Sequence, residues 1–163
     1  DLDAVNDIYN QAVRSKYQTA ETEETSLLYR QRWYEEHPRD AHPVYVAEDR
    51  GEVVGWVSLS EYRKGRKALR YTSEVSFYIR ADRQGQGIGT ELLAYVIARA
   101  REIGLKTLIA ILLEPNKPSI KLLEKFNFQI WGNMPNVAEF DGTECNHQFY
   151  GLRISDRAIR DDG

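Results

Sequence analysis

The chain has 163 residues, of which 42% are hydrophobic, and a formal net charge of −3. A chain of this length buries roughly 70% of its unfolded surface, so we expect one domain over residues 1–155 and a loosely ordered tail over 156–163. The mildly acidic balance argues against nucleic-acid partners. The single cysteine, Cys145, excludes an internal disulfide and a multi-cysteine metal site, and it favours a reducing, cytoplasmic location.

Two further observations narrow the class of protein. No apolar run exceeds seven residues, too few to cross a membrane, so we expect no membrane partner. The three histidines, His37, His42 and His147, show no ligand spacing with acids or with Cys145, so we assign no metal.

The first third of the chain predicts two helices and two strands. Apolar spacing indicates helices over residues 3–14 and 25–37, the second ended by Pro38. Strands are expected over 44–48 and 53–60, joined by a polar turn. Because the chain opens directly on a helix pattern, we expect further residues upstream, including a first strand. The helix anchors are expected to be Val5, Ile8, Tyr9 and Ala12 in the first helix and Leu28 and Trp33 in the second.

The middle of the chain predicts a strand, a crossover helix and a second strand. After a basic loop over residues 63–70, an apolar strand covers 75–79 and a long amphipathic helix starts at Ile88. Gly104 is placed to end that helix as a C-terminal cap, and the strand over 106–113 follows. The helix face expected to be buried consists of Ile88, Leu92, Leu93, Val96, Ile97 and Ala100.

The last third predicts one helix and two strands. The helix spans residues 117–126 and ends with Asn127 in the left-handed conformation. Strands over 129–132 and 147–154 are expected to pair around a connection over 136–143. Alternating elements with short connections predict an α/β domain, with a mixed sheet flanked by helices on both faces.

The stretch from Arg83 to Thr90 places three alternating glycines between the 75–79 strand and the following helix. Glycines let the backbone approach a ligand closely, and the unpaired N–H groups of the first helical turn attract phosphate. A mononucleotide P-loop would need a Lys after the last glycine, where this chain has Thr90 and Glu91. A dinucleotide fingerprint would need G-x-G-x-x-G and an acidic residue about 20 positions on, but this chain has G-x-G-x-G and Ile109.

A third pattern fits: Gln or Arg, two residues, then G-x-G, from Gln84 to Gly89. It resembles the pyrophosphate loop of the GNAT superfamily of N-acetyltransferases, which holds acetyl-coenzyme A. Residues 72–79 resemble the T-x-E-x-S-V-Y-V strand of the phosphinothricin and methionine sulfoximine acetyltransferases, and residues 8–12 and 116–128 resemble two helices of that branch. The resemblance implies a GNAT fold, acetyl-CoA as cofactor, a small amine as substrate and a homodimer.

The resemblance also implies residue roles. Acetyl transfer needs a neutral amine, so a base must take its proton, and Glu74 corresponds to the family's general base. The alternative for Glu74 is a solvated carboxylate at a strand end. Asn116 would contact coenzyme or substrate, or else cap the helix that follows it. The expected coenzyme contacts are Phe77, Tyr78 and Ile79 along the pantetheine arm, Arg83, Gln84, Gly85, Gln86, Gly87, Ile88, Gly89 and Thr90 at the pyrophosphate with Arg80 nearby, and Asn116 and Lys125.

Several of these assignments have a plain structural alternative. Residues 77–79 could simply form a buried strand, and Arg80, Arg83 and Lys125 could be solvated surface cations. The acceptor is expected to contact Glu74, Asn116 and a loop that resembles the family's R-x-A-Y, although that loop too could be merely solvated. The loop residues concerned are Arg66, Lys67, Ala68 and Leu69.

Three departures from the branch pattern bear on the acceptor. Leu123 replaces a Tyr or His near the departing thiolate, so no side-chain acid is expected there. Leu69 and Ala20 replace aromatic residues, which indicates an altered or wider acceptor site. We therefore expect direct acetyl transfer, in a ternary complex, to a small amino-acid-like amine; a peptide or protein amine, or a coenzyme-sensing module with little catalysis, are the alternatives.

Overall fold

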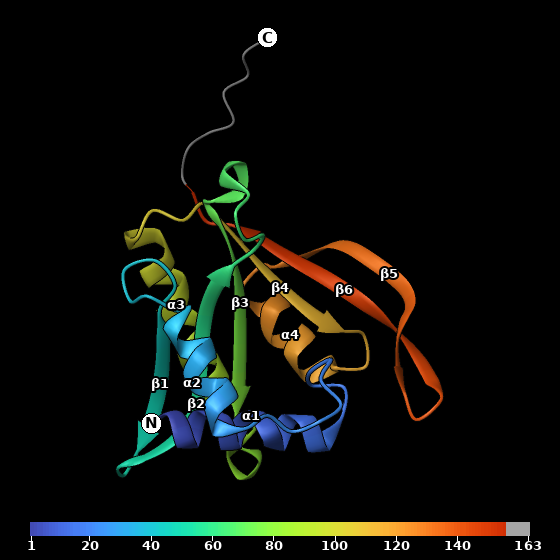
Figure 1. Ribbon diagram of the computed structural model, residues 1–163. Helices are drawn as coiled ribbons and strands as arrows, with labels where there is room; N and C mark the ends of the chain where they lie inside the picture. Colours follow the sequence, from blue (N-terminus) through green and yellow to red (C-terminus); the bar gives the residue numbers. More distant parts are fainter. Residues whose placement is uncertain (156–163) are drawn as a thin grey trace.

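The computed structural model describes residues 1–155, and the tail predicted over 156–163 lies outside them. Its strands form one six-stranded sheet in the order β1-β2-β3-β4-β6-β5 (Figure 1). The elements are α1 (Leu2–Ser15), α2 (Leu27–Glu35), β1 (Val44–Asp49), β2 (Glu52–Glu61), the 3₁₀ turn η1 (Lys67–Leu69), β3 (Thr72–Ile79), the 3₁₀ turn η2 (Ala81–Arg83), α3 (Ile88–Glu102), β4 (Thr107–Leu113), α4 (Lys117–Lys125), β5 (Gln129–Phe140) and β6 (Thr143–Arg153).

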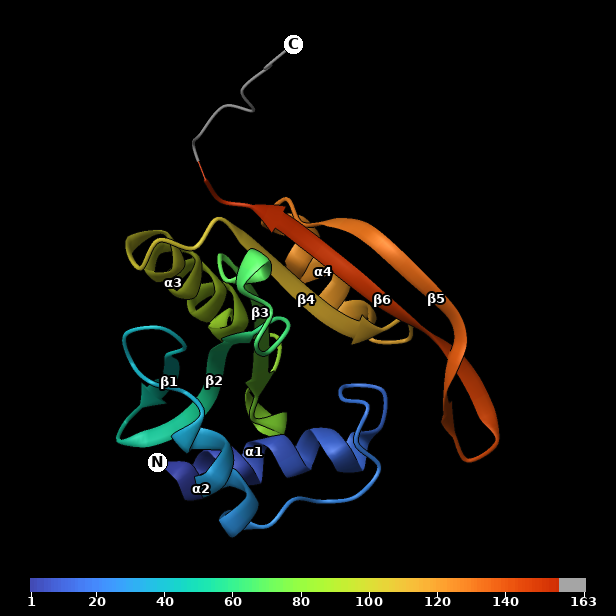
Figure 2. The ribbon, with the colours of Figure 1, turned by 45° about the horizontal axis from the view of Figure 1, so that its top comes forward.

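The sheet is mixed, as predicted. Strands β3 and β4 are parallel and are joined by the crossover helix α3, whereas every other neighbouring pair is antiparallel. Helices α3 and α4 pack on one face through the main apolar core, and α1 and α2 cover the other face over the first three strands (Figure 2). Among residues 1–155, no helix combines the length and the apolar character needed to span a bilayer.

Helix α3 forms as its sequence predicts. All six residues expected on its inner face are buried, and Gly104 follows its last turn with φ 88°, which only glycine adopts without strain. Asn127 likewise follows α4 in the left-handed conformation, with φ 66°. Gly104 therefore ends the crossover helix just before β4, and Asn127 ends α4 just before β5.

Two predictions about local structure are wrong. Leu28 is 56% exposed, and the buried residue of α2 is Arg30, which is 2% exposed. The helix has no clear apolar stripe, so spacing could not identify its inner face. The predicted connection over 136–143 is mostly strand: β5 and β6 form a long hairpin whose turn is Asp141-Gly142, both with positive φ. Asp-Gly is a typical signal for such a two-residue turn.

The sheet opens between β3 and β4. Only three residue pairs join these strands, Thr72 with Thr107, Ser73 with Leu108 and Glu74 with Ile109. Beyond Glu74, β3 remains paired with β2 through Ile79, and β4 remains paired with β6, but the two strands diverge (Figure 1). This divergence leaves one edge of β3 without a strand partner just ahead of the glycine loop.

Candidate active site

The glycine loop presents main-chain donors at the start of α3. Gly85 and Gly87 have φ of 75° and 85°, and Gly87 is the N-cap residue of α3 with no side-chain cap. The first N–H groups of the helix therefore point outward, at the positive end of its dipole. Gly89 serves packing instead, because a Cβ there would lie 2.9 Å from Cδ2 of Leu122 on α4.

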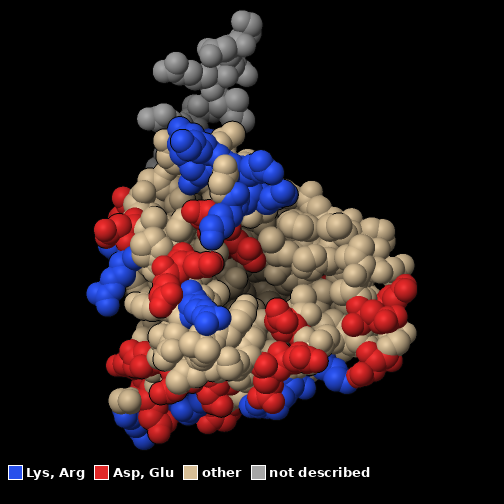
Figure 3. Space-filling model, in the orientation of Figure 1, with Lys and Arg blue, Asp and Glu red and all other residues tan. Residues whose placement is uncertain are grey.

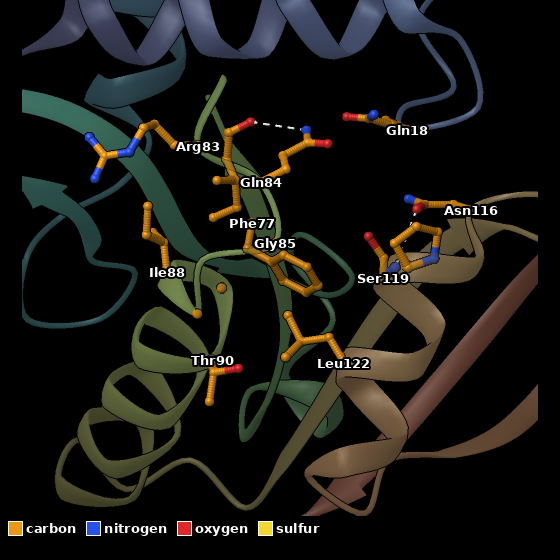
Figure 4. Close-up of a pocket in the computed structure, with 14 residues that line it drawn as sticks. Gln18, Phe77, Arg83, Gln84, Gly85, Ile88, Thr90, Asn116, Ser119 and Leu122 are labelled. Carbon is orange, nitrogen blue, oxygen red and sulfur yellow. Dashed lines mark hydrogen bonds between the residues drawn. The ribbon is translucent and has the colours of Figure 1, made fainter. Parts of the chain in front are cut away.

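A cavity of about 270 Å³ lies between this loop and α4 (Figure 4). Its floor is formed by Phe77 and Ile79 on β3, and the far wall by the first turn of α4. The full lining comprises Gln18, Phe77, Ile79, Arg83, Gln84, Gly85, Gly87, Ile88, Gly89, Thr90, Asn116, Pro118, Ser119 and Leu122. We call it the donor cavity, since its main-chain N–H groups and apolar floor suit a phosphorylated ligand with an apolar arm.

Asn116 caps α4 and also lines the donor cavity. Its Oδ1 accepts a hydrogen bond from the backbone N–H of Ser119 at 3.4 Å, and it is 9% exposed. Within residues 1–155, its amide Nδ2 has no hydrogen-bond partner. The capping alternative is thus confirmed, while contact with a ligand stays a prediction.

Of the three cationic side chains predicted near the pyrophosphate or the coenzyme, only Arg83 lines the donor cavity. Its guanidinium turns toward β1, where it pairs with Asp49 at 2.7 Å (Figure 4). Arg80 pairs with Glu52 at 3.0 Å and Asp82 at 2.7 Å, outside the donor cavity. Lys125 is exposed at the end of α4 and does not line the cavity. Gln86, whose Oε1 accepts from Arg83 at 2.9 Å, is also outside the lining.

A second cavity, of about 210 Å³, lies on the opposite face of β2 and β3. Three cross-strand pairs form its floor, Trp56 with Tyr78, Ser58 with Ser76 and Ser60 with Glu74. Period-two alternation puts all six side chains on the α1 and α2 side. Its walls are Tyr9 on α1 and Tyr29, Arg30 and Trp33 on α2. We call it the aromatic cavity.

Glu74 lines the aromatic cavity at the point where β3 and β4 diverge. It is the last residue of β3 that pairs with β4, so the sheet opens directly beside it. Within residues 1–155 its carboxylate has no hydrogen bond or ion pair, and burial raises its pKa above the ordinary value. A carboxylate of raised pKa is a stronger base than a solvated one, so the site can accept a proton here.

Ser60 beside Glu74 is held by His37. The Nδ1 of His37 lies 2.6 Å from the Trp33 carbonyl oxygen, and its Nε2 lies 2.9 Å from Oγ of Ser60. A carbonyl can only accept, so Nδ1 carries the proton and Nε2 accepts from the Ser60 hydroxyl. Burial lowers the pKa of His37, which favours this neutral form. The remaining lone pairs of Ser60 are therefore available to a donor.

The loop predicted to bind the acceptor lines a separate hollow. Arg66, Lys67 and Leu69 lie around it, and Ala68 is not in its lining. Thr72, two residues before Glu74, also lines this hollow. Alternation along β3 puts its side chain on the face that carries the aromatic cavity. Figure 3 shows Lys and Arg gathered over this loop, above a hollowed region of the surface. Contact between the loop and an acceptor stays a prediction.

Sequence reasoning missed most of the aromatic cavity. A signal was present: residues 56, 58 and 60 alternate on β2 as residues 74, 76 and 78 do on β3, so one face follows from Glu74 once the register is known. The α2 wall had no comparable signal. The residues missed as site residues are Tyr9, Tyr29, Arg30, Trp33, Trp56, Ser58, Ser60 and Ser76.

Comparison with known proteins agrees with this geometry. A model of the acetyltransferase (GNAT) family matches residues 2–128. The Bacillus subtilis protein YwnH, provisionally named a phosphinothricin acetyltransferase, is 39% identical over 95% of this chain and 94% of its own length. The L-methionine sulfoximine/L-methionine sulfone acetyltransferase of Pseudomonas paraeruginosa is 35% identical over 94% of this chain and 90% of its own. The structure of yncA from Salmonella typhimurium with its cofactor acetyl-CoA has a TM-score of 0.90 at 31% identity, covering 100% of this chain and 94% of that one.

The fold is that of an acyltransferase that uses a coenzyme A thioester. The chain belongs to the acetyltransferase (GNAT) family. The fold and the family resemblance predicted from the sequence are confirmed. The protein is an N-acetyltransferase, and acetyl-CoA is its acetyl donor.

Proposed function

We propose that this enzyme transfers the acetyl group of acetyl-CoA directly to the primary amine of a small, amino-acid-like acceptor. The single observation that carries the proposal is the position of Glu74, a carboxylate with raised pKa that lines the aromatic cavity at the point where β3 and β4 diverge. The donor approaches from the α3 and α4 side of the sheet and the acceptor from the α1 and α2 side. The reacting atoms meet where β3 and β4 part.

The steps follow from this arrangement. Glu74 takes a proton from the amine, directly or through water, and the nitrogen attacks the thioester carbonyl carbon. A backbone N–H on the open edge of β3 polarises the carbonyl oxygen, an effect worth about 3 kcal/mol in comparable sites. The C–S bond breaks, the nitrogen releases its second proton to solvent and the amide forms. Leu123 has no acidic proton to donate, so the thiolate takes its proton from water, which a thiol of pKa about 8.5 permits.

The acceptor class is inferred from two observations. The aromatic cavity, at about 210 Å³, has the size of a small molecule. The Pseudomonas relative is named for L-methionine sulfoximine and L-methionine sulfone, and an Escherichia coli relative at 30% identity is named an L-amino acid N-acyltransferase. Both names describe amines of the same class.

We also propose a cytoplasmic homodimer. Strand β5 is an edge of the sheet, and the side chains of Ile130, Trp131, Met134 and Val137 on it are 50%, 52%, 46% and 55% exposed. Apolar residues gathered on an unpaired edge favour a partner surface. The single Cys145 is a buried free thiol, which suits a reducing compartment. Light scattering is expected to give twice the chain mass, and Val137→Asp to give a monomer; a wild-type monomer would end the dimer proposal.

Two experiments test the function. Acetyl-CoA is expected to raise the melting temperature with concentration, because binding at 100 times Kd adds about 2.7 kcal/mol of stability. Release of free thiol is then measured over methionine sulfone, methionine sulfoximine, phosphinothricin, polyamines and peptides. Turnover confined to peptides would mean that the acceptor is a peptide amine and not a small amino-acid-like amine. Donor binding without turnover on any amine would leave only a coenzyme sensor.

A further inference from the structure

Arg30 is a buried cation without an acidic partner. It is 2% exposed, and within residues 1–155 no carboxylate lies at ion-pair distance from it. Its two hydrogen bonds are long: Nε donates to Oδ1 of Asn6 at 3.4 Å, and Nη2 donates to Oγ1 of Thr25 at 3.5 Å. Buried charges are ordinarily paired, so the structure leaves this one in need of an anion.

Aromatic rings hold the guanidinium in place. Its Cζ lies 4.5 Å from the Tyr9 ring centre, 4.6 Å from that of Trp33 and 5.7 Å from that of Trp56. Ring faces attract the cation but accept no strong in-plane hydrogen bond, so they orient the group without using its donors. In the described part of the chain, Nη1 has no hydrogen-bond partner, and Arg30 lines the aromatic cavity.

Trp56 supplies a second unused donor in the same cavity. The residue is 1% exposed, and its indole Nε1 has no hydrogen-bond partner in the described residues. Buried donors without a partner are rare, and each calls for an explanation such as a ligand. An indole N–H can only donate. Two residues that line one cavity therefore each have a donor atom, Nη1 of Arg30 and Nε1 of Trp56, with no acceptor among the described residues.

We propose that Arg30 and Trp56 form a subsite that donates hydrogen bonds to a charged or strongly polarised oxygen group of the acceptor. This rests on the proposed function, since Glu74 and Ser60, on the same cavity floor, supply only acceptor oxygens toward the reacting amine. The Ser60 hydroxyl already donates its hydrogen bond to Nε2 of His37. The cavity is thus polarised, with acceptors for the amine at one end and donors for oxygen at the other. The oxygen can come from the carboxylate of an amino acid or from its oxidised side chain.

The test measures kcat/KM at saturating acetyl-CoA for two matched pairs of amines. The first pair is L-methionine sulfone and its carboxamide, which differ in the carboxylate. The second is L-methionine sulfone and L-methionine, which differ in the side-chain oxygens. In at least one pair, wild type is expected to prefer L-methionine sulfone over the other amine by about 10- to 100-fold, the range of a hydrogen bond to a charged group.

Arg30→Gln is expected to abolish that preference, Arg30→Lys to retain part of it, and Trp56→Phe, which keeps an aromatic ring but removes the N–H donor, to reduce it by about 3- to 10-fold. Arg32→Gln is the matched control, because Arg32 is exposed on the same helix and the substitution removes the same charge. The control is expected to keep the wild-type preference. If Arg30→Gln does not fold, Arg30→Lys and Trp56→Phe carry the test.

Three results would overturn the subsite. One is an equal loss of rate on both members of each pair in the Arg30 and Trp56 variants, which is the mark of a purely structural role. Another is a wild-type enzyme without preference in either pair. The third is a preference abolished by Arg66→Gln and kept in Arg30→Gln, which would place the anion at the basic loop. If no amine of either pair is acetylated by wild type, the proposed function itself fails, and that outcome is distinct from these three.

Discussion

The donor cavity and the aromatic cavity are built in different ways. On its glycine-loop side, the donor cavity offers main-chain groups from one short segment, residues 83–90, at a strand-to-helix junction. The acceptor side relies on side chains from α1, α2, β2 and β3. A main-chain site tolerates many side chains but few changes of backbone conformation, whereas a side-chain site changes with single substitutions. One fold can therefore keep its donor and change its acceptor.

The largest effect is expected at Glu74, which lines the aromatic cavity beside the opening between β3 and β4. Glu74→Gln should lower kcat/KM for the amine by about 100- to 10,000-fold, the usual contribution of a general base, and leave acetyl-CoA affinity unchanged. In wild type, the rate should rise with pH as Glu74 ionises, at a pH above its ordinary pKa of 4.5 because burial raises that pKa. Steady-state rates and calorimetric titration from pH 5 to 9 test this. Full activity of the variant would remove the base role.

A backbone change should affect the donor side alone. Gly87→Ala places a Cβ on a residue with φ 85°, which costs about 1–2 kcal/mol, and should raise KM for acetyl-CoA about tenfold. Gly51→Ala is the control, because Gly51 has φ 80° in the turn between β1 and β2 and an added Cβ meets nothing at either position. Both variants should lose similar stability in urea unfolding. Equal KM values for acetyl-CoA in Gly87→Ala and Gly51→Ala would mean that the glycine loop does not hold the donor.

A smaller effect on the acceptor side is expected at His37. His37→Ala leaves the Ser60 hydroxyl unoriented and should raise KM for the amine about fivefold, with KM for acetyl-CoA unchanged. Ser60→Ala should not add to it, because both substitutions remove the same hydrogen bond. Additive effects in this double-mutant cycle would show that His37 acts elsewhere.

His37 should also give the folded protein a pH dependence. Its pKa is lowered by burial, so below the ordinary value of 6.5 the unfolded chain binds more protons than the folded one. Its contribution to stability is therefore complete above that pH and declines as pH falls below it. Urea unfolding between pH 5 and 8 should show a shallower decline in His37→Ala than in wild type. The same decline in both would contradict the assignment.

The smallest effect concerns the contribution of Glu74 to the stability of the folded protein. Its raised pKa means that the folded state binds more protons above pH 4.5, so stability falls as pH rises through this range. Glu74→Gln removes this penalty and should gain stability relative to wild type between pH 4 and 7. Glu48→Gln, at an exposed position on β1, is the control and should show no such gain. A loss of stability in Glu74→Gln would mean that the charge is compensated in the fold.

The sequence predicted what depends on neighbours along the chain. The buried face of α3, the caps at Gly104 and Asn127 and the glycine loop each follow from spacing and residue type within about 15 positions. The inner face of α2 could not be predicted, because Arg30 is buried by rings from α1 and β2 that only the fold brings together. The extent of the β5–β6 hairpin was also missed, although the Asp-Gly turn signalled it.

The parting of β3 and β4 also affects how the protein exchanges hydrogen. From Val75 to Ile79, β3 has main-chain groups on one edge with no strand beside them among residues 1–155. Amide protons on that edge should exchange with solvent much faster than those directed toward β2, although both belong to one central strand. A thioester arm in the gap would act as an extra strand and slow them selectively. A donor bound in this way would complete the enzyme's central sheet.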